Sequence, residues 1–170
     1  MFSFIYYYKR VVFFNLKKLI FLLSRVFNLT NHFNSSFNTD SVNMPWSISN
    51  PNLVIGLAYN YSIADIKVFI SSLRKVDYDS SVILVVSPDI DNDTIVYLES
   101  NDIKYVVWYF NRSSDRHLLN ARFEVFHLII QCLPAVVNNI FISDVRDVVF
   151  QSSIFSHIDI NGSSELHFFH

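Results

Sequence analysis

The sequence has little cysteine, glycine or proline, and each shortage excludes a class of protein. A single cysteine, Cys132, among 170 residues excludes an internal disulfide framework and a cysteine-rich metal site, and we expect this thiol to be a small buried hydrophobe. Two glycines and four prolines exclude collagen-like and Gly/Pro-rich low-complexity chains. Because Gly56 is the only glycine before Gly162, there is no Gly-x-Gly-x-x-Gly or Walker loop, which excludes a dinucleotide-binding fingerprint and a P-loop NTPase.

The N-terminal segment lacks an uncharged apolar run long enough to span a bilayer. The uncharged runs between its basic residues, 11–16 and 19–24, are six residues each, against the roughly 18–20 that a spanning helix needs. We therefore predict that residues 1–29 form a basic amphipathic helix on a membrane surface, which implies peripheral association in the cytoplasm. Packing on the domain or on a partner helix is the main alternative, and a signal-anchor leading to the Golgi lumen is a third. The basic residues of this helix are Lys9, Arg10, Lys17, Lys18 and Arg25.

Basic residues are also scarce in the rest of the chain. The net charge is −2, yet residues 1–30 carry five basic residues and no acid. The other 140 residues then hold eight basic against fifteen acidic side chains. An acidic body excludes nucleic acid as the main partner, because a phosphate-tracking surface needs clustered Lys and Arg.

What the chain does have is apolar content, and its distribution divides the sequence. Hydrophobic types make up 51% of the residues, which excludes a disordered chain and allows an ordinary core. Residues 30–51 are rich in Asn and Ser without an apolar period, which predicts a linker. We expect residues 52–170 to form a single α/β domain.

From residue 52 onward, strand patterns alternate with helix patterns. The strand patterns are short apolar runs rich in β-branched residues, and the helix patterns space their apolar residues three or four apart. This alternation predicts an α/β fold with a mostly parallel, doubly wound sheet and flanking helices. The predicted strands are 53–59, 82–86, 103–110 and 139–143, and the predicted helices are 63–75, 91–100 and 118–133.

Two carboxylates follow the last of these strands. Asp144 and Asp147 are three residues apart and can converge if the chain turns there. Ligands of open α/β sheets bind at the carboxyl ends of strands, and paired carboxylates suit a hard cation such as Mg²⁺ or Mn²⁺. Arg146, between them, would hold one carboxylate or face a diphosphate. The alternative is a capped turn in which Arg146 neutralises both aspartates.

The string FISDVRDVVFQSSIF resembles a motif of GT-A-fold nucleotide-sugar glycosyltransferases, in which Asp-x-x-Asp follows a strand and precedes an apolar strand and Phe-Gln. A similar Asp-x-x-Asp occurs in the glycosyltransferase domain of lysyl hydroxylases. The stretch NLVIGLAYNYSIADIKVFISSLRK is similar to the opening strand and helix of that fold. The resemblance covers about residues 52–155 and implies a GT-A-like, Rossmann-like sheet.

The resemblance implies transfer of a sugar from a nucleotide diphosphate sugar, a UDP- or GDP-sugar, to an acceptor. Asp147 would coordinate Mn²⁺ or Mg²⁺ most directly, and Asp144 would share the ion or contact the ribose. Arg122 would hold phosphate or an acidic side chain of the motif, with a structural ion pair as the alternative. The segment Ala58-Tyr59-Asn60 would lie where the nucleotide binds.

The chain departs from the family pattern in two places. Ser152 and Ser153 stand where the family often has Asp-Pro, which we expect to alter a turn rather than the metal site. The sequence also ends at an apolar stretch, 164–170, that looks like the start of another strand, so we expect only the donor-binding half of a transferase. Two other functions stay open: a non-catalytic α/β module or inactive remnant, and a metal-dependent phosphotransfer or hydrolase domain that uses the same aspartates.

Overall fold

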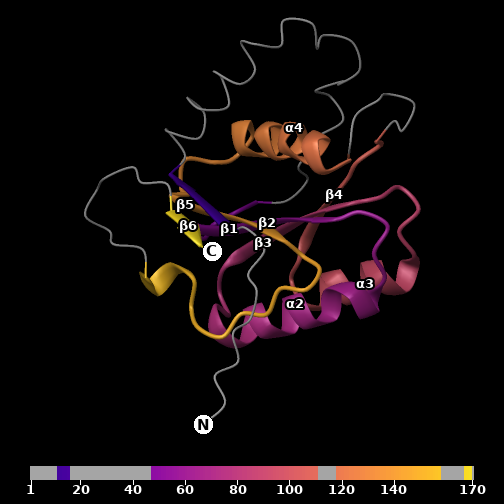
Figure 1. Ribbon diagram of the computed structural model, residues 1–170, viewed down its shortest axis with the longest axis horizontal. Helices are drawn as coiled ribbons and strands as arrows, with labels where there is room; N and C mark the ends of the chain where they lie inside the picture. Colours follow the sequence, from indigo (N-terminus) through magenta and orange to yellow (C-terminus); the bar gives the residue numbers. More distant parts are fainter. Residues whose placement is uncertain (1–10, 16–46, 111–117, 158–166, 170) are drawn as a thin grey trace, which may run out of the picture.

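The computed structural model describes residues 11–15, 47–110, 118–157 and 167–169, which include the alternating elements of an α/β domain (Figure 1). The predicted strands and helices are confirmed, with one strand shorter than expected because β4 covers only four residues. In chain order the elements are β1 (Val11–Asn15), β2 (Asn52–Ala58), α2 (Ile63–Val76), β3 (Ser81–Val86), α3 (Asn92–Ser100), β4 (Lys104–Val107), α4 (Leu118–Gln131), β5 (Asn139–Asp144), a short 3₁₀ helix (Phe155–His157) and β6 (His167–Phe169).

The sheet contains four parallel strands in the order β4-β3-β2-β5. Helices α2 and α3 lie on one face and α4 lies on the other (Figure 1). Each face has its own apolar cluster: Phe69 of α2 belongs to the first and Phe126 of α4 to the second. The small α/β fold with flanking helices is therefore as predicted.

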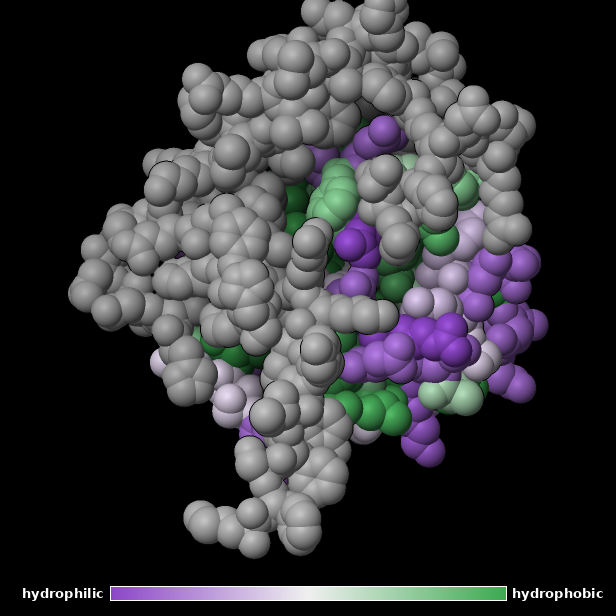
Figure 2. Space-filling view, viewed as in Figure 1, coloured by the Kyte–Doolittle hydropathy of each residue, from purple (hydrophilic) through white to green (hydrophobic). Residues whose placement is uncertain are grey.

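Burial on both faces explains the continuous apolar runs in the central strands. All residues of β3 from Val82 to Val86 are buried, as expected for a parallel strand covered by helices on both sides. In α2 the buried residues fall on one stripe, Ile66, Phe69, Ile70 and Leu73, which is the spacing of a helix with one apolar face. Described residues on the α3 side are mainly hydrophilic at the surface in this view (Figure 2).

Two further strands extend the sheet beyond β5. Strand β1 pairs antiparallel with β5, and β6 pairs antiparallel with β1. The helix predicted for residues 1–29 is therefore wrong at Val11–Asn15, where β-branched and aromatic residues favour a strand and pairing satisfies the open edge of β5. The rest of 1–29, and with it the predicted membrane-surface helix, lies outside the described residues.

No helix in the described part of the chain is both long enough and apolar enough to cross a bilayer.

The end of the predicted linker belongs to the domain. Ile48 is buried in the apolar cluster on the α4 face. The carbonyl of Pro51 accepts hydrogen bonds from the backbone N–H groups of Asn138 and Asn139, at 2.9 and 3.0 Å.

The prediction that Cys132 is a small buried hydrophobe is wrong. Helix α4 ends at Gln131, and Cys132, which follows it, is exposed.

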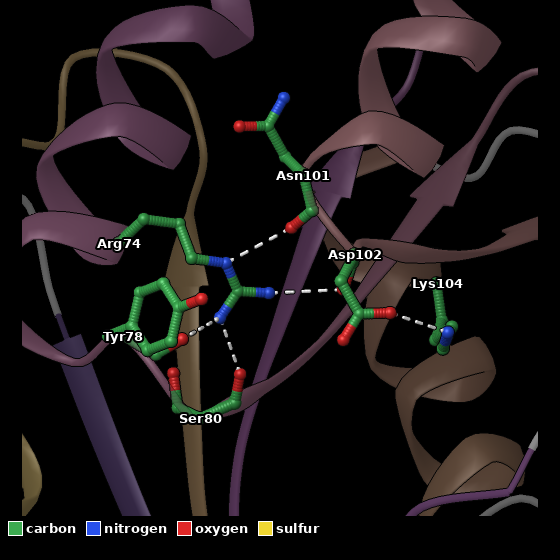
Figure 3. A network of polar contacts seen from close by, with 6 residues as sticks. All are labelled: Arg74, Tyr78, Ser80, Asn101, Asp102 and Lys104. Atoms are coloured by element: carbon green, nitrogen blue, oxygen red, sulfur yellow. Dashed lines mark hydrogen bonds and ion pairs between the residues drawn. The ribbon is translucent and has the colours of Figure 1, made fainter.

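Arg74, at the end of α2, joins three segments on the side of the sheet away from the strand ends discussed below (Figure 3). Its Nε donates to the carbonyl of Asn101 at 3.1 Å, and Nη2 donates to that of Asp102 at 3.1 Å. Nη1 donates to the carbonyls of Tyr78 at 3.1 Å and Ser80 at 2.6 Å. Partial burial lowers the pKa of Arg74, but an arginine stays charged at neutral pH.

Replacing Arg74 with lysine is expected to lower the free energy of unfolding by about 1–2 kcal/mol, because an ammonium cannot replace a planar fork that serves four carbonyls. Urea denaturation measures the change. The control is Lys75→Arg at the exposed neighbouring position, which should stay within about 0.5 kcal/mol of the parent. Equal denaturation midpoints for Arg74→Lys and the parent would show that the network adds no stability.

Candidate functional site

The carboxyl ends of β2 and β5 lie side by side at the point where the order of the sheet reverses. Leu57 pairs with Asp144 across these two strands. From β2 the chain continues through α2 toward β3 and β4, and it returns through α4, on the opposite face, to β5. Ligands of open α/β sheets bind outside the carboxyl ends of the strands at such a switch point. The segment after Ala58 and the Asp-x-x-Asp turn therefore share the expected binding edge.

The turn after β5 is fixed by its two valines. Val145 and Val148 are buried in the apolar cluster beneath α2 and α3, while Arg146 and Asp147 are exposed. Asp147 has a φ of 65°, in the left-handed region that aspartate tolerates better than most residues. Buried and exposed side chains thus alternate so that the charged groups of the turn face solvent.

Gly56 of β2 makes room for this arrangement. A Cβ at residue 56 would lie 2.5 Å from Cγ2 of Val145 and 3.0 Å from Cδ2 of Leu84. Val145 therefore packs directly over the glycine backbone. Gly56 is therefore the position of β2 against which the Asp-x-x-Asp turn packs.

On the α4 side, Arg122 pairs with the turn. Its Nη1 donates to Oδ1 of Asp144 in an ion pair. The side chain of Arg122 is 21% exposed and that of Asp144 is 36% exposed. The guanidinium also lies over the ring of Phe123, with Cζ 5.0 Å from the ring centroid. This ion pair fits both the contact with an acidic side chain of the motif and the structural ion pair that were left open for Arg122.

On the α2 side, Arg146 faces a second acidic group. Its Nη2 lies 3.7 Å from Oδ1 of Asp65, and its Cζ lies 5.8 Å from the ring centroid of Tyr61. Asp65 also accepts hydrogen bonds from the N–H and Oγ of Ser62, at 3.0 and 2.8 Å. These bonds lower the pKa of Asp65. Arg146 thus forms its ion pair with Asp65, so the capped turn in which Arg146 neutralises both neighbouring aspartates is not the arrangement found.

Tyr61 lies on the α2 side of this charged edge, beside Arg146. Burial raises the pKa of its hydroxyl most, Arg146 opposes the rise, and the carboxylates of Asp144, Asp65 and Asp147 add to it. The tyrosine is therefore a neutral hydroxyl at physiological pH, able to donate a hydrogen bond as well as accept one.

The end of β2 turns sharply before α2. Asn60 has a φ of 58°, and its N–H donates to Oγ of the buried Ser87, at the end of β3, at 3.1 Å. Ala58 is buried. The ring of Tyr59 lies edge-on to those of Trp108 and Phe110, with centroids 5.9 and 6.3 Å away. Tyr59 therefore packs toward the α4 face, whereas Tyr61 packs toward α2.

The segment after the turn is held against α2 by hydrogen bonds. The N–H of Phe150 donates to Oγ of Ser72 at 3.1 Å. The buried carboxylate of Asp77 accepts from Oγ of Ser153 and, at 2.7 Å, from the N–H of Ile154. Ser153, one of the departures from the family pattern, thus ties this segment to the end of α2.

The carboxylates of the turn fit a divalent cation only in part. Within the described ranges, no three or more His, Cys, Asp or Glu side chains converge in a way that would hold a metal ion. One carboxylate, that of Asp144, already accepts from Arg122. Mg²⁺ is commonly held by one or two carboxylates together with substrate phosphates. The residues present fit a cation that arrives with phosphate oxygens, and they do not form an all-protein cage.

The structure brings most of the predicted site residues to one edge and adds others. Asn60, Arg122, Asp144, Arg146 and Asp147 border the switch point, while Ala58 is core and Tyr59 is directed to the aromatic cluster. The sequence reasoning missed residues that complete the edge. The Ser-x-x-Asp pattern before the α2 stripe is a capping signal, and its position directly after a strand end was the available clue. The residues missed are Tyr61, Asp65 and Ser87.

No family model, curated protein or solved structure matches the chain.

Proposed function

We propose that this chain binds a nucleotide diphosphate sugar, a UDP- or GDP-sugar, together with Mn²⁺ or Mg²⁺, and supplies the donor-binding part of a GT-A-like glycosyltransferase. One observation carries the proposal: the Asp-x-x-Asp turn projects its charged side chains at the topological switch point, between Arg122 on one side and Tyr61 on the other. This is the place where an open α/β sheet binds its ligand. The membrane-surface attachment predicted for residues 1–29 is not part of the proposal, because Val11–Asn15 pair with β5 and β6 in the sheet.

Asp147 and Arg146 are the residues of the turn that are free to meet a diphosphate. Asp147 is exposed, so its carboxylate would be available to hold the ion. Arg146 is 60% exposed on its side chain, so its guanidinium can turn from Asp65 toward phosphate oxygens at low desolvation cost. When bound, the ion supplies Lewis-acid assistance to the departing diphosphate.

The segment after β2 would border the nucleoside. Asn60 is exposed and held by Ser87 in the left-handed region, which leaves its side-chain amide available for polar contacts with a base or ribose. Tyr61 offers a neutral hydroxyl beside the aspartates. The ring of Tyr59 packs against those of Trp108 and Phe110, so the role of Tyr59 would be to position this segment.

A thermal-shift screen of the full chain against UDP, GDP and their sugars, with and without Mn²⁺, tests the proposal. A ligand that binds only the folded state raises the melting temperature by mass action, equivalent to about 2.7 kcal/mol at a hundred times its dissociation constant. We expect a rise that requires both the metal and one of the two nucleotides. A chain that melts cooperatively without any rise would favour the non-catalytic α/β module.

A phosphotransfer or hydrolase activity at the same aspartates is separated by its products. A hydrolase that cleaves the diphosphate bridge would convert UDP-sugar, in the presence of Mn²⁺, to UMP and sugar 1-phosphate, which chromatography detects. A donor-binding domain would produce neither product.

A further inference from the structure

The two carboxylates of the turn are not equivalent. Asp144 is engaged by Arg122 from α4, and that arginine side chain is mostly buried. Asp147 is exposed, and the described residues place no ion-pair partner on it. The surroundings of the two aspartates therefore differ, and the unequal roles that the resemblance implies have a physical basis in the pairing of Asp144 with Arg122.

Releasing Asp144 would leave Arg122 in an unfavourable position. Nε of Arg122 is already buried without a hydrogen-bond partner among the described residues. Loss of the Asp144 contact would leave a mostly buried guanidinium with neither a counter-charge nor its Nη1 acceptor. Removing one partner of a buried or partly buried pair costs much more than the pair contributes. A cation that competes for Asp144 has to meet this cost.

We infer that Arg122 withholds Asp144 from the metal, so that Asp147 is the only carboxylate of the turn offered to a divalent cation and the site retains that cation only when a diphosphate supplies further oxygens. The inference rests on the proposed function for the identity of the diphosphate. The pairing of Arg122 with Asp144 stands independently of that function.

Thermodynamic linkage between metal and nucleotide binding makes this inference measurable as a change in metal affinity. A site with one available carboxylate binds metal weakly alone, and the nucleotide strengthens metal binding by the same factor by which metal strengthens nucleotide binding. By holding Asp144, Arg122 keeps the binding of metal alone weak. Its role is positional, because it acts on the metal through Asp144.

The test is a titration of Mn²⁺ alone into the full chain, without nucleotide, followed by the loss of the aqueous Mn²⁺ signal in electron paramagnetic resonance. Arg122→Met frees Asp144 and should tighten Mn²⁺ binding by about fivefold or more, at the lower end of typical coupling factors. The matched control is Arg146→Met, which also removes one positive charge beside the two aspartates but leaves Asp144 held by Arg122. It should tighten binding clearly less than Arg122→Met.

The double variant Arg122→Met, Asp144→Asn should lose the gain, since the released carboxylate is then absent. Equal tightening in Arg122→Met and Arg146→Met would overturn the inference, because the effect would then be one of net charge. Tight Mn²⁺ binding by the parent without nucleotide would also overturn it.

A second comparison decides the matter if Arg122→Met does not fold. In the parent background, Asp147→Asn should remove the weak binding of Mn²⁺ alone, while Asp144→Asn should change it less than twofold, about the reproducibility of such a titration. Equal losses in the two variants would show that both carboxylates hold the ion. None of these readouts uses a nucleotide, so failure of the proposed function appears separately, as the absence of a nucleotide-dependent shift in the parent.

Discussion

Asp147→Asn is expected to abolish the rise in melting temperature that Mn²⁺ and a nucleotide diphosphate produce together, while the free protein melts as the parent does. Asparagine has nearly the same shape and tolerates the left-handed conformation, φ 65°, that residue 147 adopts. The side chain is exposed, so its charge adds little to folding. The substitution therefore removes a proposed metal ligand without disturbing the turn.

The loss of affinity should be large. Removal of an outer-shell partner of a metal ligand already costs roughly 10–100-fold in metal affinity, and loss of the only available carboxylate should cost at least as much. Isothermal titration of the matching nucleotide in the presence of Mn²⁺ measures it. Without the metal, the parent and Asp147→Asn should bind the nucleotide equally weakly.

Asp89→Asn is the matched control for Asp147→Asn. Asp89 is an exposed aspartate in the loop that follows β3, at the same edge of the sheet, so the substitution removes the same charge near the proposed site. Its nucleotide affinity should stay within about twofold of the parent, because a surface charge at some distance is screened by salt. A nucleotide response in Asp147→Asn that equals the parent's would remove the metal assignment.

The sheet could be predicted from the sequence because its continuous apolar runs are stable only as strands that are buried on both faces. A run such as that of β3, buried along its length, makes a stable element only between two covered faces. The helices between the strands carry one apolar stripe each, as in α2. Local patterns and global fold agree in this part of the chain.

Strand β1 was not predictable from the same signals. The residues Val11–Asn15 carry apolar and aromatic side chains that suit a helix face and a strand equally. What decides is the edge of β5, with which these residues pair in antiparallel register. Because that edge is formed by a segment more than a hundred residues away, no local pattern near the N-terminus reports it.

The position of the candidate site could be predicted from the sequence, but the ion pairs between its arginines and aspartates could not. Asp144 and Asp147 follow a buried strand, which indicated the edge of the sheet at which the candidate site lies. Open α/β sheets bind ligands at the carboxyl ends of their strands, and this rule identified that edge as a binding edge. Which arginine meets which carboxylate depends on how α4 and α2 flank the turn. Arg146 is adjacent to both aspartates in sequence yet pairs with Asp65, while Arg122 reaches Asp144 from another helix.

Gly56→Ala should both destabilise the domain and weaken nucleotide binding, although residue 56 lies beneath the turn rather than in it. The added Cβ would lie 2.5 Å from Cγ2 of Val145 and 3.0 Å from Cδ2 of Leu84, closer than packed carbons approach. Overpacking of this kind costs about 1–3 kcal/mol. Because Val145 is a stiff β-branched residue within the Asp-x-x-Asp turn, the strain is relieved by moving the turn. A shift of about 1 Å in such a group can reduce binding or catalysis a hundredfold.

A double-mutant cycle distinguishes displacement of the turn from a general effect of alanine in the strand. Val145→Ala removes the methyl group that the new Cβ meets, and alone it should cost about 1–3 kcal/mol from lost burial. If the two side chains compete for the same space, the variant Gly56→Ala, Val145→Ala should lose less stability than the two single changes added together, by about 1 kcal/mol or more. Its nucleotide response should also recover relative to Gly56→Ala. If the two losses of stability add strictly, the loss in Gly56→Ala arises elsewhere, at Leu84 or in the strand backbone. Contact between residue 56 and Val145 would then not explain the effect.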